Sequence, residues 1–309
     1  MTYFVLFAGF ALLLVSGEFL VRGGVSLAGH FNISPMVIGL TIVSFGTSSP
    51  ELVVSLDAAI TGYPDISVGN VVGSNISNIG LVLALTVIMA PFVVSRKEIL
   101  DDIIIMTAVF MLMFIMLYDL HLSRFEGIVL VLLLAVYLFR SIRNDKKENG
   151  DVAGNSRYSL LMSVVIIVLS CIGLVAGADM LVRSAGTIAS RMGVSERIIS
   201  VSVIAVGTSL PELATSFMAA IRKKNDIAIG NVVGSNIFNV LAILGLTATI
   251  KPFRINDAGF TSDMYWMTGI ALLLIVMIVP SANPKLTRWK GILLALVYLS
   301  YIYIVFLVR

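Results

Sequence analysis

Two short stretches, each present twice along the chain, decide the fold. Residues 46–52 read Gly-Thr-Ser-Ser-Pro-Glu-Leu, and residues 207–213 read Gly-Thr-Ser-Leu-Pro-Glu-Leu. The same offset of 161 positions carries the octapeptide Gly-Asn-Val-Val-Gly-Ser-Asn-Ile at 69–76 unchanged onto 230–237. Chance similarity between apolar helices would match Leu with Val, but it would not keep Thr, Ser, Pro, Glu and Asn in register. The second half of the chain therefore repeats the first.

Composition places both copies in a membrane. Of the 309 residues, 58% are hydrophobic and only 13% are charged, whereas soluble globular proteins carry about 25% charged residues. The net charge of +3 is too small for a nucleic-acid-binding face. The single Cys171 excludes a disulfide framework and a Cys-based metal site. These figures exclude a cytosolic enzyme, a disordered chain and a nucleic-acid binder.

Ten apolar segments fill the chain, each of a length suited to a membrane-spanning helix. They cover residues 3–22, 35–60, 66–90, 102–118, 123–142, 158–182, 195–221, 227–250, 264–281 and 289–308. Helices are the expected conformation, because lipid satisfies no backbone polar groups and no segment shows the alternation of a barrel strand. The expected fold class is an all-α polytopic membrane protein with ten transmembrane helices.

The repeat divides these helices into two sets of five. We expect a first repeat at 1–142, a linker at 143–157 and a second repeat at 158–309. Because five is an odd number, the two copies would cross the membrane in opposite senses, as the inverted repeats of secondary transporters do. Placing the N-terminus outside puts most of the 21 Lys and Arg residues in inside loops. The sequence thus predicts a plasma (inner) membrane protein with both termini outside and a cytoplasmic linker.

Two carboxylic acids lie deep in the apolar segments. Glu51 and Glu212 occupy equivalent places, each directly after a proline. A charge at the centre of a bilayer costs at least ~2.5–3.5 kcal/mol on insertion scales, so such a residue marks a functional site by default. Pro50 and Pro211 lack the N–H that a helix interior needs, so each is expected to break its helix and free backbone carbonyls just before it.

Oxygen-bearing side chains share one helical face with these acids. In the first copy they are Ser44, Thr47, Ser48, Glu51 and Ser55, and in the second Thr208, Ser209, Glu212 and Ser216. The next helix of each copy adds a stripe spaced four residues apart, namely Asn70, Ser74 and Asn78, or Asn231, Ser235 and Asn239. Carboxylate, hydroxyl and carbonyl oxygens are the ligands of hard cations such as Ca²⁺ and Na⁺.

The glycines of the octapeptide predict close helix approach. Gly69 and Gly73, like Gly230 and Gly234, form a small-xxx-small face. The alternative interpretation of this segment is that its Gly and Asn residues, Asn75 and Asn236 included, only join helices.

Other charged residues are interpreted more simply. Asp57 either lines the cytoplasmic vestibule or is a solvated residue near a helix end. Glu18 with Arg22, and Asp179 with Arg183, are spaced i,i+4 and predict structural ion pairs.

Charge counting favours a cation as the substrate. Two ionised carboxylates supply −2, which matches one Ca²⁺, or two Na⁺ with further Na⁺ held by neutral oxygens. The motif core contains no Lys, Arg or His to bind an anion and no soft ligand for copper. Without a phosphate-binding loop, no nucleotide cofactor is expected.

The two Gly-Thr-Ser-x-Pro-Glu segments and the octapeptides that follow resemble the two alpha repeats of the sodium/calcium exchanger family, in the calcium/cation antiporter superfamily. The resemblance covers nearly the whole chain and is closest to the prokaryotic type. It implies that the second, third, seventh and eighth helices hold the ions, while the first and sixth slide across them. It implies no cofactor beyond the transported Ca²⁺ and Na⁺.

The resemblance also implies a ligand set. Glu51 and Glu212 would be shared by Ca²⁺ and Na⁺, with Asn78 and Asn239 at the centre. Backbone carbonyls would come from Ser44, Thr47, Ala205 and Thr208, and flanking hydroxyls from Ser48, Ser74, Ser209 and Ser235. Some family members carry Asp where this chain has Asn239, which leaves Na⁺ stoichiometry, proton use and K⁺ dependence open.

The leading hypothesis is therefore an antiporter, not an enzyme, that exchanges Ca²⁺ for Na⁺ by alternating access in the lipid bilayer. No nucleic acid and no obligate protein partner are expected. The closest alternative is a Ca²⁺/H⁺ antiporter, since a desolvated Glu is readily protonated. A Ca²⁺-permeable channel and an intramembrane enzyme are the remaining classes, and no protease motif or nucleophile–base set supports the enzyme.

Overall fold

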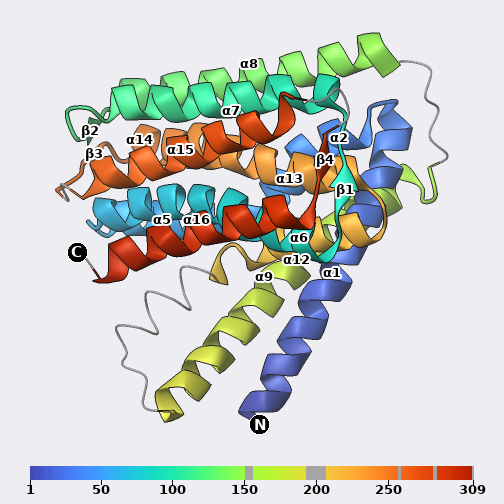
Figure 1. Ribbon diagram of the computed structural model, residues 1–309, viewed down its shortest axis with the longest axis horizontal. Helices are drawn as coiled ribbons and strands as arrows, with labels where there is room; N and C mark the ends of the chain where they lie inside the picture. Colours follow the sequence, from blue (N-terminus) through green and yellow to red (C-terminus); the bar gives the residue numbers. More distant parts are fainter. Residues whose placement is uncertain (150–155, 193–206, 257–258, 281–283, 308–309) are drawn as a thin grey trace.

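The computed structural model describes residues 1–149, 156–192, 207–256, 259–280 and 284–307, almost all of them helical (Figure 1). The helices of the first half are α1 (Thr2–Phe31), α2 (Pro35–Ile38), η1 (Gly39–Val43), α3 (Ser44–Thr47), α4 (Ser49–Ile60), α5 (Pro64–Ser77), η2 (Asn78–Leu83), α6 (Ala84–Met89), α7 (Arg96–Met116) and α8 (Arg124–Asn149). Those of the second half are α9 (Leu160–Arg191), α12 (Leu210–Ile221), α13 (Asn225–Phe238), η4 (Asn239–Leu244), α14 (Gly245–Ile250), α15 (Phe260–Ile278) and α16 (Arg288–Leu307). The segments labelled η are π-helical.

Most of the expected spans are present. Within the described ranges, eight helices are long and apolar enough to cross a membrane, and the bent pair Pro35–Thr47 and Ser49–Ile60 makes a ninth. The seventh expected span is seen only as α12, because residues 195–206 lie outside the described part of the chain. The chain is therefore a multi-pass helical membrane protein.

Two helices are longer than the apolar pattern predicts. The expected ends at residues 22 and 182 are wrong, since α1 continues to Phe31 and α9 to Arg191. Each apolar run was expected to end near an arginine, and each arginine forms an ion pair with an acid one turn earlier. Arg22 pairs with Glu18, and Arg183 pairs with Asp179. A neutralised charge does not stop a helix, so both continue past the expected boundary.

The elements between residues 49 and 89 agree in type and length with those 161 positions later. α4 and α12 each have 12 residues, and α5 and α13 each have 14. The π-helices η2 and η4 and the short helices α6 and α14 correspond in the same way. Two small antiparallel sheets link the halves: β1 (Phe92–Val93) pairs with β4 (Lys285–Leu286), and β2 (His121–Leu122) pairs with β3 (Phe253–Arg254).

The helices α1 and α9 form an antiparallel pair that projects from the rest of the bundle (Figure 1). The pair crosses closely at two glycines, because a Cβ on Gly9 would lie 2.9 Å from the Gly177 carbonyl, and a Cβ on Gly177 would lie 2.9 Å from that of Gly9. α1 also rests on α12, where a Cβ on Gly17 would lie 3.0 Å from the Ala214 carbonyl. Small residues therefore bring these backbones close together, while Leu20 of α1 is fully buried in the apolar core.

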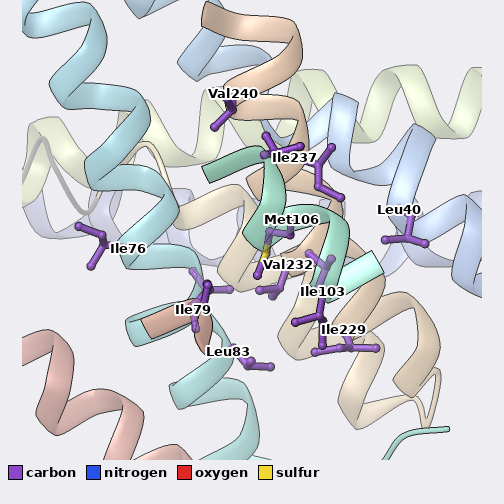
Figure 2. Packing of buried hydrophobic residues seen from close by; sticks show 14 of the residues in the cluster. Leu40, Ile76, Ile79, Leu83, Ile103, Met106, Ile229, Val232, Ile237 and Val240 are labelled. Carbon is purple, nitrogen blue, oxygen red and sulfur yellow. The ribbon is translucent and has the colours of Figure 1, made fainter. Parts of the chain in front are cut away.

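The centre of the bundle is α13. In the most apolar stretch of Asn225–Ile250 every residue is buried. In the corresponding stretch of α8, which lies at the periphery, only 17% of the residues are buried. Figure 2 shows the apolar packing around it: Ile229 and Val232 of α13 lie among Ile103 of α7, Leu83 of η2 and Leu40 of η1. The polar stripe on α13 is thus held in the best-packed part of the molecule.

The two identical octapeptides have different surroundings. A Cβ on Gly230 would lie 2.9 Å from the Met36 carbonyl, and one on Gly234 would lie 2.5 Å from the Leu40 carbonyl. The expectation of close approach is confirmed for these two glycines. It is wrong for Gly69 and Gly73, where an added Cβ would meet nothing within 4 Å among the described atoms.

This difference gives a matched pair of variants. Gly234→Ala drives a methyl group into backbone and the Ser44 hydroxyl, so we expect it to lower the free energy of unfolding by about 1–3 kcal/mol, the usual cost of overpacking. Gly73→Ala, at the equivalent position, has open space and should be neutral or slightly stabilising. Thermal unfolding in detergent measures both, and equal melting temperatures for the two variants would contradict this packing.

Candidate functional site

The second span is broken immediately before Glu51. α3 ends at Thr47, α4 begins at Ser49, and the two helices meet at an angle of 47°. Pro50 lies in the first turn of α4, where a helix needs no N–H from that residue. Pro211 and Glu212 lie in the same places in α12. Each Glu therefore lies in the first turn of a helix, where the helix dipole favours a negative charge.

The break frees fewer carbonyls than the sequence suggested. The Gly46 carbonyl accepts a hydrogen bond from the Ser49 hydroxyl at 2.8 Å. The Ser44 carbonyl accepts from the Ser48 N–H at 2.9 Å and from the Thr47 hydroxyl at 3.3 Å. No hydrogen bond to the Thr47 carbonyl across the break is found within the described ranges. The Thr47 carbonyl is therefore available to a ligand.

The two carboxylates are fully buried and only partly hydrogen-bonded. Glu212 Oε1 accepts from the Ser48 hydroxyl at 2.9 Å and from the Ser235 hydroxyl at 3.4 Å. Glu212 Oε2 and both oxygens of Glu51 have no hydrogen-bond partner in the described residues. The Glu51 carboxyl lies close to the Glu212 carboxyl and to the Thr208 hydroxyl. An uncompensated carboxylate in a dry interior costs several kcal/mol, so these three oxygens require a cation or a proton.

An amide in each copy fixes the helix that carries the Glu. Asn70 donates to the Ser55 hydroxyl at 2.9 Å and to the Glu51 carbonyl at 3.2 Å. Its counterpart Asn231 donates to the Ser216 hydroxyl at 3.0 Å and to the Glu212 carbonyl at 3.4 Å. These four polar residues, which the sequence placed on the site face, therefore tie α4 to α5 and α12 to α13.

The remaining predicted residues fall into groups. Asn78 is fully buried, and neither its amide nitrogen nor its oxygen has a partner among the described residues. The Asn239 amide nitrogen donates to Asn75 Oδ1 at 3.0 Å, while its own oxygen is unpartnered in the same part of the chain. Asn75, which the sequence left undecided, thus positions a predicted central residue.

Four other predicted residues differ in how deeply they lie. Ser74 and Ser209 are buried, and the Ser209 hydroxyl has no partner in the described ranges. Thr208 is only half-buried. Ala205 lies outside the described residues.

Two π-helical segments begin at the central asparagines, η2 at Asn78 and η4 at Asn239. A π-helical turn widens the helix by one residue, and such turns occur frequently at functional sites. Neither is predictable from the sequence, because no residue type in these stretches marks a π-turn.

A small cavity lies next to the site. A cavity of about 170 Å³ lies between α9 and the two helix breaks, lined by Pro50, Val175, Ala178, Asp179, Val182, Gly207, Thr208 and Pro211. One of its lining residues, Thr208, lies close to the Glu51 carboxyl. Neither Glu51 nor Glu212 is among the lining residues, so the cavity borders the site at Thr208 without reaching the carboxylates.

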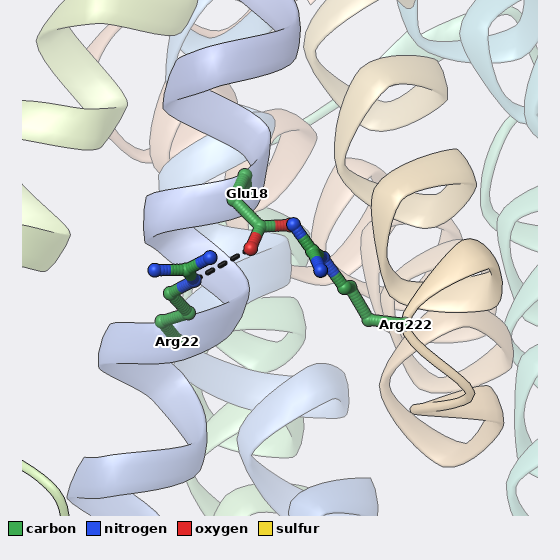
Figure 3. Close-up of polar contacts among 3 residues, drawn as sticks. All are labelled: Glu18, Arg22 and Arg222. Atoms are coloured by element: carbon green, nitrogen blue, oxygen red, sulfur yellow. Dashed lines mark hydrogen bonds and ion pairs between the residues drawn. The ribbon is translucent and has the colours of Figure 1, made fainter.

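The opposite end of α12 is fastened to α1. Glu18 Oε1 accepts from Arg22 Nε at 2.5 Å, and Glu18 Oε2 accepts from Arg222 Nε at 2.7 Å (Figure 3). In the other copy the position equivalent to Arg222 is Thr61, and the exposed Asp179–Arg183 pair stays within α9. The i,i+4 pairs were predicted, but the link to Arg222 was missed because it joins residues far apart in the sequence.

Comparison with known proteins agrees with this geometry. The family described as sodium/calcium exchanger protein matches residues 1–143 and 162–307. The putative antiporter CaxA of Alkalimonas amylolytica is 37% identical over 314 residues, which cover 99% of this chain and 98% of that protein. The inner membrane protein YrbG of Escherichia coli strain K12 is 32% identical over 311 residues, which cover 96% and 95%.

A solved structure has the same fold. The sodium-calcium exchanger NCX_Mj, soaked with Na⁺ and Ca²⁺, superposes with a TM-score of 0.84 and 32% identity, covering 99% of this chain and 98% of that one. The family match, the identities and this superposition all extend over nearly the full length. The chain therefore belongs to the sodium/calcium exchanger family of membrane cation antiporters.

Proposed function

We propose that this protein exchanges Ca²⁺ for Na⁺ across the plasma (inner) membrane by alternating access. The observation that carries the proposal is the pair of fully buried carboxylates with three oxygens that lack a donor, surrounded by hydroxyl and amide groups. Both charges need compensation, and one Ca²⁺ supplies it in full. The name of NCX_Mj gives the same pair of ions for that protein.

The proposed ion site lies between the two helix breaks and the two π-helical segments. Its side-chain ligands are Glu51, Glu212, Ser48, Ser209, Ser74, Ser235, Asn78 and Asn239, and its backbone ligands are Ser44, Thr47, Ala205 and Thr208. Ca²⁺ takes six to eight oxygens, and two carboxylates with neutral oxygens around them supply such a shell. Because Na⁺ would use the same oxygens, the two ions exclude each other, and this exclusion couples their fluxes.

The proposed architecture is ten transmembrane helices in two inverted five-helix repeats, 1–142 and 158–309, joined by a cytoplasmic linker at 143–157. Three features support it. The equivalent helices α1 and α9 run antiparallel, each small sheet takes one strand from each half, and α12 coincides with the last part of the span expected at 195–221. With an even number of spans, both termini would lie on the same side, and the loop charges favour the outside. The name of the relative YrbG supports the inner membrane as the location.

Alternating access would come from the α1–α9 pair. It contacts α12 through Gly17 and through the Glu18–Arg222 ion pair at one end, and it borders the cavity at the other. Movement of this pair along α12 would break the ion pair and close the cavity, so that one end opens as the other closes.

The coupling ion decides between the leading proposal and its rival. In everted vesicles, an imposed Na⁺ gradient should drive Ca²⁺ uptake, and a pH gradient alone should drive little or none. The measurement is ⁴⁵Ca²⁺ accumulation under each gradient with the membrane potential clamped. Uptake driven by the pH gradient and indifferent to Na⁺ would instead establish a Ca²⁺/H⁺ antiporter.

Removing one carboxylate separates the function from the fold. Glu51→Gln halves the site charge, so we expect exchange to fall to near background. Because the Glu51 oxygens have no donor, the neutral amide should leave the free energy of unfolding in Ca²⁺-free buffer unchanged or raise it by about 1 kcal/mol or more. Added Ca²⁺ should raise the melting temperature of the wild type but not of the variant.

The matched control is Glu126→Gln. Glu126 caps α8 through Ser123, and Gln serves the same capping box. It should keep both exchange and the Ca²⁺-induced stabilisation. Wild-type exchange in Glu51→Gln would refute the ion site.

Adjacent serines provide a finer test. Ser48 donates to Glu212, whereas its neighbour Ser49 donates to the Gly46 carbonyl. A hydrogen bond to a charged group contributes about 1.5–3 kcal/mol, so Ser48→Ala should weaken apparent Ca²⁺ affinity about tenfold or more. Ser49→Ala should leave that affinity within about twofold, although it loses a backbone-directed hydrogen bond. Calcium titrations of exchange report both values, and equal affinities for the two variants would remove Ser48 from the site.

A further inference from the structure

A second pocket lies at the end of α12 that faces away from the ion cavity. It has a volume of about 280 Å³ and is enclosed by α1, the segment before α9 and the turn between α12 and α13. Four cationic side chains line it, Arg22, Arg157, Arg222 and Lys224, against the single carboxylate Glu18. The lining therefore carries a net charge of +3, in contrast to the acidic ion site.

The arginines keep hydrogen-bonding capacity for a ligand. Arg22 and Arg222 both bind Glu18 through Nε, so their terminal Nη groups are not taken by that carboxylate. The Tyr158 side chain also lies close to the Arg22 guanidinium. The guanidinium of Arg157 lies 5.7 Å from the centre of the Tyr158 ring. Planar guanidinium groups with free N–H donors match the oxygens of a phosphate group.

The position of the pocket matches the membrane–water boundary. Arg157 lies two residues before the N-cap of α9, Arg222 is the C-cap of α12, and Lys224 is the N-cap of α13. Val21 and Val25 add an apolar wall from α1. A pocket with a cationic rim at helix ends and an apolar wall fits a group that has an anionic head and an apolar body.

We propose that this pocket binds a phosphate-bearing anion, the headgroup of an anionic phospholipid. A bound phosphate would contact Arg22 and Arg222, which meet at Glu18, and would thereby join α1 to α12. This inference concerns binding alone and does not depend on which ions the protein exchanges.

The test uses the purified full-length protein in neutral detergent. Short-chain phosphatidylglycerol, short-chain phosphatidylcholine and inorganic phosphate are each titrated as Tris salts at constant ionic strength, and binding is followed by calorimetry. If the ligand is a lipid headgroup, phosphatidylglycerol should bind saturably, phosphate should bind more weakly, and phosphatidylcholine should not bind. Phosphate binding as tightly as phosphatidylglycerol would keep the site but assign it to a free anion.

The variant Arg157→Gln/Lys224→Gln removes two charges without touching the Glu18 ion pairs. Each basic residue near an anionic headgroup contributes about fivefold in affinity, so the double variant should lose about 30-fold. Lys224→Gln alone changes an exposed residue and should lower the affinity for phosphatidylglycerol about fivefold. It replaces the double variant in the test if that variant does not fold.

The matched control is Arg143→Gln/Lys285→Gln, which removes two charges that do not line the pocket. It should bind phosphatidylglycerol like the wild type. Absence of saturable binding of either anion, or an equal loss in variant and control, overturns the proposal.

Discussion

The structure depends on the need to neutralise two carboxylates in a dry interior. Glu51 and Glu212 are fully buried in helices that pack at the centre of the bundle, and three of their four oxygens have no donor among the described residues. Burial of such charges without compensation is among the costliest arrangements in a protein. A cation or a proton must therefore neutralise the site, and under the proposed function Ca²⁺ and Na⁺ would compete for the same oxygens.

Other features hold the carboxylates at this point. The prolines place each Glu in the first turn of a helix, and the amides of Asn70 and Asn231 lock the adjacent helix against it. Close backbone contact at Gly234 brings α13 against the broken second span. The α1–α9 pair is built differently: its helices cross through glycines, and α1 is fastened to α12 at the Glu18–Arg222 ion pair.

Much of this could be predicted from the sequence. The repeat, the buried acids and the proline breaks are local signals with a direct physical meaning, and together they give the family. What could not be predicted depends on tertiary neighbours. Gly73 and Gly234 stand in identical octapeptides, yet only Gly234 touches another backbone. The Ser49 hydroxyl donates to the Gly46 carbonyl, which Pro50 leaves without a backbone donor, whereas the Ser48 hydroxyl donates to Glu212. Nothing in the motif distinguishes these two serines.

The most direct test of a shared site is competition between the two ions for binding. Calcium affinity of the purified protein, measured by calorimetry at rising Na⁺ with choline as the ionic-strength control, should fall as Na⁺ rises, with an unchanged number of Ca²⁺ sites. The slope of log Kd against log Na⁺ concentration should exceed one, because two Na⁺ are needed to match the charge of one Ca²⁺. A Ca²⁺ affinity that Na⁺ leaves unaltered would show that the two ions do not share the oxygens around Glu51 and Glu212.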